Sequence, residues 1–252
     1  MKTSGNTILI TGGGSGIGEA LAHRFHDAGN TVIVSGRRKE ALESAIAGRA
    51  NMHAVTLDIS DKASIADFAQ RITTDFPALN VLINNAGIMR VEDPSSARPL
   101  DDAEATIATN LLGPIRMIDA LVDHLKAQAD AAIVNVSSGL AFVPLPATPT
   151  YAATKAALHS YTITLREHLR DAVEVIELAP PGVQTELTPG QSTAAGYMPL
   201  DAYIDEVMAL FAEQPTPAEI LVEQVKPLRF AEASGKFGEI FARMAQVVKQ
   251  RG

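Results

Sequence analysis

Six short apolar runs, each rich in β-branched residues, alternate with longer segments of helical periodicity along most of the chain. Their nearly continuous hydrophobicity is typical of strands that are buried on both faces of a parallel sheet. Consecutive parallel strands need a right-handed, usually helical crossover between them, so the alternation predicts an α/β fold. We expect a doubly wound, mostly parallel, Rossmann-like sheet of six to seven strands with helices on both faces. The expected strands are 7–11, 31–35, 52–57, 81–85, 131–136 and 173–178, and the expected helices are 19–29, 39–48, 62–76, 101–126 and 151–170.

The alternation stops after Pro180. Residues 181–215 are rich in Pro, Gly, Ser and Thr and contain only two short amphipathic pieces, a composition typical of a long loop. We expect residues 186–215 to form a substrate-binding loop or lid. The sequence contains no linker-like segment and no internal repeat, so we assign residues 1–252 to a single domain.

Composition and charge exclude several classes of function. A formal net charge of −8 opposes binding to phosphate backbones, so we expect no nucleic-acid partner. The absence of cysteine removes disulfides and thiolate metal sites, and we expect no metal. The N-terminal segment turns polar and rich in glycine after five strand-like residues, so it predicts neither a signal peptide nor a membrane span. We expect a cytoplasmic protein.

A glycine-rich turn follows the first expected strand. Gly12, Gly16 and Gly18 lie in the stretch TGGGSGIG, which also contains Ser15 and Ile17 and leads into a helical pattern. Glycine is needed where backbone approaches a pyrophosphate closely and where a helix packs tightly on a strand. The first turn of the helix then offers free N–H groups to phosphate. By itself such a cluster could also be a flexible turn, but its strand-turn-helix context favours a dinucleotide site.

A second candidate site lies in SSGLAFVPLPATPTYAATK, residues 137–155. Tyr151 and Lys155 are four residues apart, so on a helix they share one face and the ammonium can approach the phenol. Ser138 follows the expected strand 131–136, at the sheet edge where open parallel sheets bind ligands. Taken alone, the pair could be an amphipathic helix start with a solvated lysine.

These motifs occur together with others in a fixed order. They are TGGGSGIG, NNAG at 84–87, Asn110 in TNLLG, Ser138, Tyr151 with Lys155, and PPGVQT at 180–185. In this order and spacing, residues 5–186 closely resemble the single-domain short-chain dehydrogenase/reductases. The C-terminal third resembles the family loosely, because it lacks the Asp-Gly-Gly turn that often follows the last strand. Whether a seventh strand forms is therefore left open.

The resemblance implies catalytic roles for four residues. Tyr151 would be the general acid/base, Ser138 would bind the substrate oxygen, Lys155 would contact the nicotinamide ribose, and Asn110 would position Lys155 through water. The chemistry is consistent, since Lys155 and an oxidised nicotinamide ring would together lower the phenol pKa by roughly 2–3 units.

The resemblance also implies a set of cofactor contacts from five segments of the chain. Asp58 could equally be a helix N-cap, and the NNAG residues could be purely structural. The expected contacts are Gly12, Ser15, Gly16, Ile17 and Gly18; Asp58 and Ile59; Asn85, Ala86 and Gly87; Tyr151 and Lys155; and Pro181, Gly182, Val183 and Thr185.

The end of the second expected strand indicates which cofactor is bound. Members that use NAD usually have an acid there, which repels a 2′-phosphate. This chain has Gly36 at that position, followed by Arg37 and Arg38, whose guanidinium groups can bind phosphate. We expect NADP to be preferred and NAD to be possible. The alternative is that both arginines begin a solvated helix.

We predict a carbonyl reductase or alcohol dehydrogenase acting on a small, hydrophobic molecule. Two alternatives are an epimerase or dehydratase that retains its cofactor, and a nonenzymatic dinucleotide sensor. The family resemblance further implies a homodimer or homotetramer built on helices 101–126 and 152–170. The hydrophobic preference depends on residues expected beside the nicotinamide, namely Met89, Leu140, Phe142, Val143, Leu145, Leu187, Tyr197 and Met198.

Overall fold

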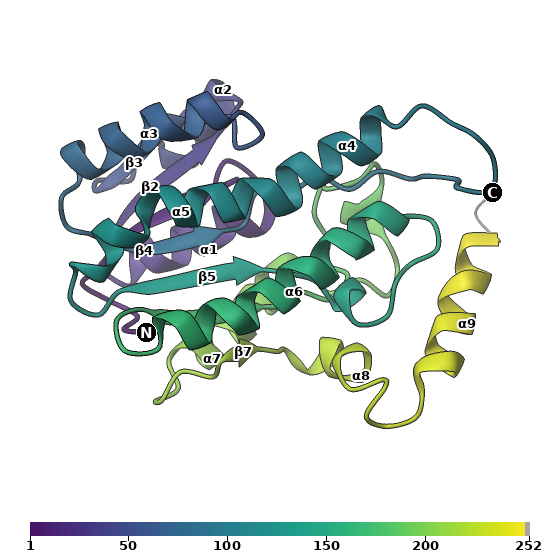
Figure 1. Ribbon diagram of the computed structural model, residues 1–252. Helices are drawn as coiled ribbons and strands as arrows, with labels where there is room; N and C mark the ends of the chain where they lie inside the picture. The colour runs from purple at the N-terminus through teal and green to yellow at the C-terminus, as the bar shows by residue number, and fades with distance from the viewer. Residues whose placement is uncertain (250–252) are drawn as a thin grey trace.

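The apolar runs form the central sheet of the molecule (Figure 1). The computed structural model describes residues 1–249. Its seven strands are all parallel and lie in the order β3-β2-β1-β4-β5-β6-β7. This confirms the predicted fold class. The strands are β1 Thr7–Thr11, β2 Thr31–Gly36, β3 Met52–Thr56, β4 Leu79–Asn84, β5 Ala132–Val136, β6 Glu174–Leu178 and β7 Glu219–Ile220.

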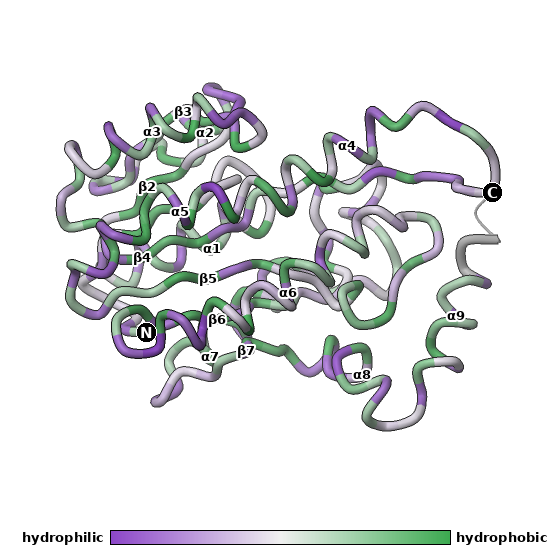
Figure 2. Tube along the Cα trace, viewed as in Figure 1, coloured by the Kyte–Doolittle hydropathy of each residue, from purple (hydrophilic) through white to green (hydrophobic). Residues whose placement is uncertain are grey.

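Helices cover both faces of the sheet because successive strand residues point to opposite sides. In β1, Ile8 and Ile10 join one buried apolar cluster and Leu9 joins the other. The first cluster packs under α1 (Gly16–Asp27), α2 (Lys39–Ile46) and α7 (Leu200–Phe211). The second packs under α3 (Lys62–Asp75), α5 (Gly113–Lys126) and α6 (Pro149–Leu169). Figure 2 shows the hydrophobic strands between these helices, whose outer turns are more polar. Each fully buried Leu or Ile contributes about 1.5–3 kcal/mol.

The expected helix 101–126 is not regular throughout. It consists of α4 (Asp101–Ile107), a π-helical turn (Ala108–Leu112) and α5. Pro114 has no N–H, which removes one α-helical hydrogen bond at the start of α5. Asn110 lies in the π turn and is fully buried. Such single wide turns often occur at functional sites.

The C-terminal part adds the short strand that the sequence left open. β7 pairs with the end of β6, with Glu219 beside Glu177 and Ile220 beside Leu178. The region then continues through α8 (Lys226–Arg229) to α9 (Phe237–Lys249), which lies away from the sheet in Figure 1. Ile240 of α9 is buried against this outer part of the fold. Of the expected lid, residues 200–211 are the helix α7, while residues 186–199 are largely irregular. No helix in residues 1–249 combines the length and hydrophobicity needed to cross a membrane.

Candidate active site

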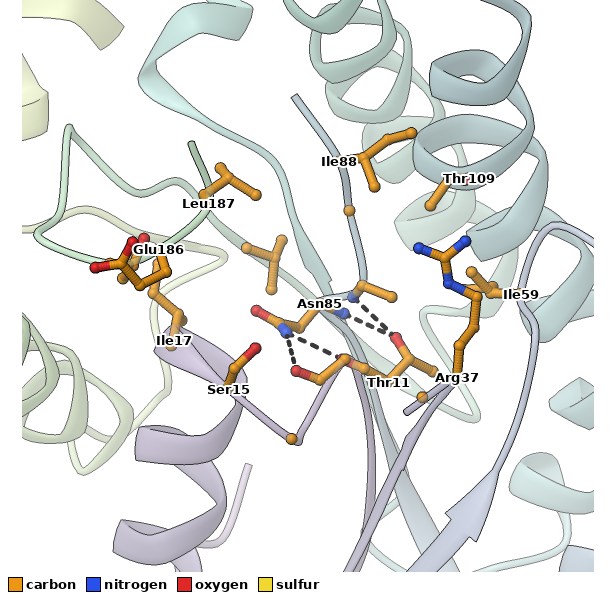
Figure 3. Close-up of a pocket in the computed structure, with 18 of the residues that line it drawn as sticks. Thr11, Ser15, Ile17, Arg37, Ile59, Asn85, Ile88, Thr109, Glu186 and Leu187 are labelled. Atoms are coloured by element: carbon orange, nitrogen blue, oxygen red, sulfur yellow. Dashed lines mark hydrogen bonds between the residues drawn. The ribbon is translucent and has the colours of Figure 1, made fainter. Parts of the chain in front are cut away.

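A cleft of about 360 Å³ opens along the carboxyl ends of β1, β4, β5 and β6. It lies where the chain turns from one half of the sheet to the other, between β1 and β4, which is where open α/β sheets bind ligands. Figure 3 shows Ser15 and Ile17 of the glycine-rich turn on one side of the cleft, near Glu186, and Arg37 beside Ile59 on the other. Of the predicted site residues, these line the cleft: Gly12, Ser15, Gly16, Ile17, Arg37, Arg38, Asp58, Ile59, Asn85, Ala86, Gly87, Ser138, Tyr151, Lys155, Pro181, Val183 and Thr185.

The glycine-rich turn is shaped by close backbone contacts. Gly12 has φ of +68°, and a Cβ there would lie 2.8 Å from the Ala86 Cα. A Cβ on Gly18 would lie 2.3 Å from the Gly12 carbonyl oxygen, so α1 can approach β1 only if this residue is glycine. Gly18 does not line the cleft; it is buried beneath it. In the structure its place in the motif is one of close packing, and its contact with a cofactor stays a prediction.

The Asn85–Gly87 turn is tied to the glycine-rich turn by hydrogen bonds, drawn as dashed lines in Figure 3. The Asn85 side-chain amide donates to the Thr11 carbonyl oxygen at 3.0 Å. The backbone N–H groups of Asn85 and Ala86 both donate to the Thr11 hydroxyl at 3.1 Å. These residues thus have a structural role and also line the cleft, so the two interpretations of NNAG are compatible.

Positive charge gathers at the β2 end of the cleft. Both Arg37 and Arg38 line it, and the Arg38 Nη2 lies 3.4 Å from the Ser15 hydroxyl. A Cβ on Gly36, the residue before these arginines, would meet only a Leu42 methyl group, at 3.7 Å, so there is free space beside Gly36.

Asp58 lies near this positive end, and its surroundings favour the ionised carboxylate. Hydrogen bonds from the Ser60 hydroxyl, then from its backbone N–H, and the charge of Arg37 outweigh burial and lower the Asp58 pKa. Asp58 does not cap α3; Asp61 does, accepting from the Ala63 N–H at 2.9 Å. The N-cap alternative for Asp58 is therefore wrong.

Ser138, Tyr151 and Lys155 meet at the other end of the cleft. Ser138 follows β5 and its hydroxyl accepts from the Leu140 N–H at 3.1 Å. Tyr151 and Lys155 lie on the first turns of α6, with the Lys155 Nζ 5.6 Å from the centre of the phenol ring. That ammonium donates to the Val136 carbonyl oxygen at 2.8 Å. Both side chains are buried, with Tyr151 7% and Lys155 4% exposed.

Burial dominates the acidity of this pair. It raises the pKa of Tyr151 to about 12, with a further small increase from Tyr197, although the Ser138 hydroxyl acts in the opposite direction. Burial lowers the pKa of Lys155 to about 8, and the negative charge of Glu177 opposes that change. In the chain alone Lys155 thus does not lower the Tyr151 pKa, and the lowering expected with an oxidised nicotinamide ring beside it stays a prediction. The ammonium is directed to the Val136 carbonyl rather than to the phenol oxygen, while desolvation disfavours the phenolate.

Asn110 and Gly182 lie behind the lining rather than in it. The Asn110 side chain accepts from the Ile88 N–H at 2.9 Å and donates to the Ile88 carbonyl oxygen at 2.8 Å. A Cβ on Gly87 would lie 3.3 Å from the Asn110 Oδ1 and 3.7 Å from the Lys155 Nζ, so these groups are close neighbours. Gly182 lies under the Tyr197 ring.

Most of the apolar residues expected around the substrate do not line the cleft, although Tyr197 is close enough to Tyr151 to affect its pKa. Of that set only Leu187 lines the cleft. Val143 is buried with Ala231 and Ile240 in a separate cluster. Met198 pairs with Val183 and packs on the main core. An apolar side chain in a loop can pack in a core as well as line a pocket, and Val143 and Met198 pack in apolar clusters.

Several lining residues were not expected as cofactor or catalytic residues. Gln191 is buried, and its amide donates to the Val183 carbonyl oxygen at 2.9 Å and to the Thr185 hydroxyl at 3.0 Å. Its position in the Pro- and Gly-rich stretch gives no sequence signal. Other cleft residues outside the expected cofactor and catalytic sets are Ile88, Thr109, Ser137, Glu186 of the expected lid, and Arg90, which could bind a carboxylate or be an exposed surface residue.

A family model described as short chain dehydrogenase matches residues 6–195. The chain belongs to the short-chain dehydrogenase family. It is 38% identical over 248 residues to the uncharacterized oxidoreductase DltE of Bacillus subtilis (strain 168), over 97% of this chain and 98% of that relative.

Two solved structures extend the likeness to the whole fold. A short chain dehydrogenase from Burkholderia cenocepacia J2315 in complex with NADP is 27% identical, with a TM-score of 0.81, and the match covers 97% of this chain and 99% of that one. A 3-ketoacyl-(acyl-carrier-protein) reductase from Brucella melitensis complexed with NADH is 28% identical, with a TM-score of 0.75, covering 85% and 93%. The protein is thus an NAD(P)-dependent oxidoreductase of the short-chain dehydrogenase family, as the motifs predicted.

Proposed function

We propose that this short-chain dehydrogenase interconverts a small carbonyl compound and the corresponding alcohol, with Tyr151 as the proton donor and acceptor. The observation that carries the proposal is the convergence of Ser138, Tyr151 and Lys155 on one end of the cleft. The opposite end carries two guanidinium groups, Arg37 and Arg38. A site with a proton donor at one end and anion-binding groups at the other suits a reaction that uses a phosphorylated cofactor.

The cleft fits a nicotinamide dinucleotide. Its glycine-rich turn leaves no side chain where Gly12 and Gly16 face the cleft, and α1 begins there with N–H groups that lack intrahelical acceptors. In this proposal Asp58 and Ile59 would hold the adenine end, and Val183 and Thr185 the nicotinamide end; all four line the cleft. A dinucleotide bound here would supply or accept the hydride.

The protein's own residues manage the proton and the substrate oxygen. The Ser138 hydroxyl would donate to the substrate oxygen and hold it beside Tyr151. A phenol with a pKa of about 12 keeps its proton at neutral pH, so Tyr151 is ready to donate to a carbonyl oxygen. In the reverse direction Tyr151 must accept a proton as the phenolate, and the positive charges of Lys155 and of an oxidised nicotinamide ring would favour that form.

We propose that NADP is preferred over NAD. Arg37 and Arg38 offer positive charge at the adenosine end, and the open position at Gly36 carries no acid to repel a 2′-phosphate. Charge-assisted hydrogen bonds of this kind contribute about 1.5–3 kcal/mol each. Arg37→Ala should therefore weaken NADPH binding about tenfold to a hundredfold and leave NADH binding nearly unchanged. A wild-type ratio of kcat/KM for NADPH to that for NADH at or below one would refute this preference.

We also propose that the protein is a homodimer or homotetramer. Ile107, Leu112 and Ile163 are large apolar side chains exposed on the α4–α5 segment and on α6, the helices on which the family resemblance places a dimer contact. Leu112→Glu should lower the mass measured by light scattering. A monomeric wild-type protein would contradict the proposal.

We place the substrate lid in the irregular part of residues 186–215. Leu187 and Gln191 line the cleft, whereas α7 is anchored in the core through Tyr203 and Phe211. A movable lid would therefore be confined to residues 186–199. Substrate-dependent protection of these residues, but not of α7, from amide hydrogen exchange would support it.

A panel of ketones, aldehydes and alcohols assayed with each cofactor tests the proposed activity. The panel should include charged aldehydes as well as hydrophobic ketones, because Arg90 and Glu186 share the cleft with Ile88 and Leu187. With the best substrate, Tyr151→Phe should lose about 10²–10⁴-fold in kcat and keep its fold and NADPH affinity. If the variant retains more than about a tenth of the wild-type rate, Tyr151 is not the proton donor.

A further inference from the structure

A row of buried polar side chains crosses three strands directly beneath α6. Asn84 of β4, Asn135 of β5 and Glu177 of β6 lie at matching positions of neighbouring strands. The Asn84 amide donates to the Asn135 side-chain oxygen at 2.9 Å, and the Asn135 amide donates to the Thr162 hydroxyl of α6 at 3.0 Å. Glu177 is the one member of the row that carries charge, and it is completely buried.

Both oxygens of the Glu177 carboxylate are occupied. The Ser137 hydroxyl donates to Oε1 at 2.5 Å, and His159 Nδ1 lies 2.7 Å from Oε2. An isolated carboxylate in such a place would cost several kcal/mol, so its partners are essential to the fold. Ser137 directly follows β5, and His159 is on α6, one turn beyond Lys155.

We propose that Glu177, together with His159, is a positioning residue for Lys155 and Ser138; this rests on the function proposed above. Ser137, whose hydroxyl donates to Glu177, lies in the chain between Val136 and Ser138. Its neighbour Val136 accepts the hydrogen bond from the Lys155 ammonium, and its other neighbour is Ser138.

The helix carries the other half of the arrangement. Tyr151, Lys155 and His159 are spaced four residues apart, so they follow one another along one face of α6. His159 bonded to Glu177 therefore fixes the rotation of α6 against β5 and β6 next to Lys155. A turn of the helix would move the phenol and the ammonium together, away from Ser138.

The charged groups around Glu177 determine which of them its negative charge stabilises most. The neighbouring groups are Lys155 and His159 of α6, Glu219 of β7 and Arg229 of α8. Arg166 of α6 is also near, but its guanidinium donates to the backbone oxygens of Val175 and Ala218. The guanidinium of Arg229 is bound by both oxygens of Glu219, at 2.9 and 3.0 Å. The Arg229 charge is thus largely matched, and the Glu177 charge opposes the effect of burial on Lys155.

A metal ion is a weaker explanation of the same cluster. Ligand atoms of His159, Glu177 and Glu219 lie within 4.8 Å of one another. However, Ser137, His159 and Arg229 already bind the carboxylate oxygens. An ion would have to displace the Arg229 pair, and the guanidinium would then face it as a like charge.

The test measures NADPH binding by its fluorescence between pH 7 and pH 10, which requires no turnover. Wild-type affinity should weaken as Lys155 loses its proton, and Lys155→Met should abolish that pH dependence. In Glu177→Gln, which keeps the shape and removes the charge, the midpoint should move about one pH unit lower. Glu177→Asp keeps the charge and should keep the wild-type midpoint. Glu174→Gln, on the same strand but outside the network, is the matched control.

Two results would overturn the charge effect: an unchanged midpoint in Glu177→Gln, or an equal shift in Glu177→Asp. Should Glu177→Gln fail to fold, Ser137→Ala removes only one hydroxyl; we expect about a tenfold loss of kcat with the binding midpoint unchanged. Wild-type kcat in Ser137→Ala would overturn the anchoring of β5. An active Tyr151→Phe would instead refute the proposed function and leave the binding shifts as they are.

Discussion

Replacing Lys155 by Met should make the protein more stable and less active. Burial lowers the Lys155 pKa from the usual 10.5 to about 8, so the folded chain binds the proton of this side chain less tightly than the unfolded chain does. At about 1.36 kcal/mol per pKa unit, this costs about 3 kcal/mol below pH 8. Loss of the hydrogen bond to the Val136 carbonyl offsets about 1 kcal/mol. We therefore expect a net gain of about 2 kcal/mol at pH 7, or about 4–8 °C in Tm.

The dependence on pH identifies the cause. Between pH 8 and pH 10.5 the unfolded wild-type chain still binds this proton and the folded chain has lost it, so wild-type stability rises with pH. The advantage of Lys155→Met should be complete below pH 8 and shrink as the pH rises through that window. Urea unfolding of both proteins at pH 7, 8, 9 and 9.5 measures it.

A matched control separates burial from the loss of any lysine. Lys126 is about half exposed on α5, so Lys126→Met should change stability by no more than about 0.5 kcal/mol. The reasoning fails if Lys155→Met is less stable than wild type at pH 7, or if the difference between them stays constant from pH 7 to pH 9.5.

Three further perturbations test other parts of the site. Gly36→Asp combined with Arg37→Ala should reverse the cofactor preference, because it adds repulsion against a 2′-phosphate and an acceptor for the NAD ribose; an unchanged kcat/KM ratio would show that Arg37 is only solvated. Gly18→Ala should destabilise the fold by at least about 2 kcal/mol in urea titrations, since its Cβ would lie 2.3 Å from the Gly12 carbonyl oxygen; near-wild-type stability would contradict the close packing of α1. Asn110→Ala should lower the Tm, because the backbone N–H and the carbonyl oxygen of Ile88 would each lose a hydrogen bond. A wild-type Tm would mean that the π turn does not depend on Asn110.

The strands and most helices could be predicted because hydrophobic pattern follows secondary structure directly. The expected strands 7–11 and 31–35 agree with β1 and β2 to within one residue. The short strand β7 could not be predicted, since two residues carry no periodicity. It forms because Glu219 and Ile220 find partners at the end of β6, which is a tertiary event.

The candidate site was partly predictable for a similar reason. Residues in recognisable motifs, such as Ser138 and Tyr151, do lie together around one cleft. In the chain alone burial raises the pKa of Tyr151, an effect that the sequence does not show because it reveals the charged neighbour but not the depth of the site. Glu177 and His159 belonged to an ordinary strand and helix in the sequence, and only the sheet register brings them together.

The π-helical turn at Ala108–Leu112 makes the segment from α4 to α5 sensitive to its own length. A wide turn accommodates one residue more than an α-helical turn would. Deleting a single residue here would remove the wide turn and leave α4 and α5 in phase, so α4 would keep its packing on α6 and α5 its packing on α3. The local widening that holds the Asn110 side chain against the Ile88 backbone would be lost instead. An evolutionary loss of one codon could therefore yield a more regular helix and an inactive protein.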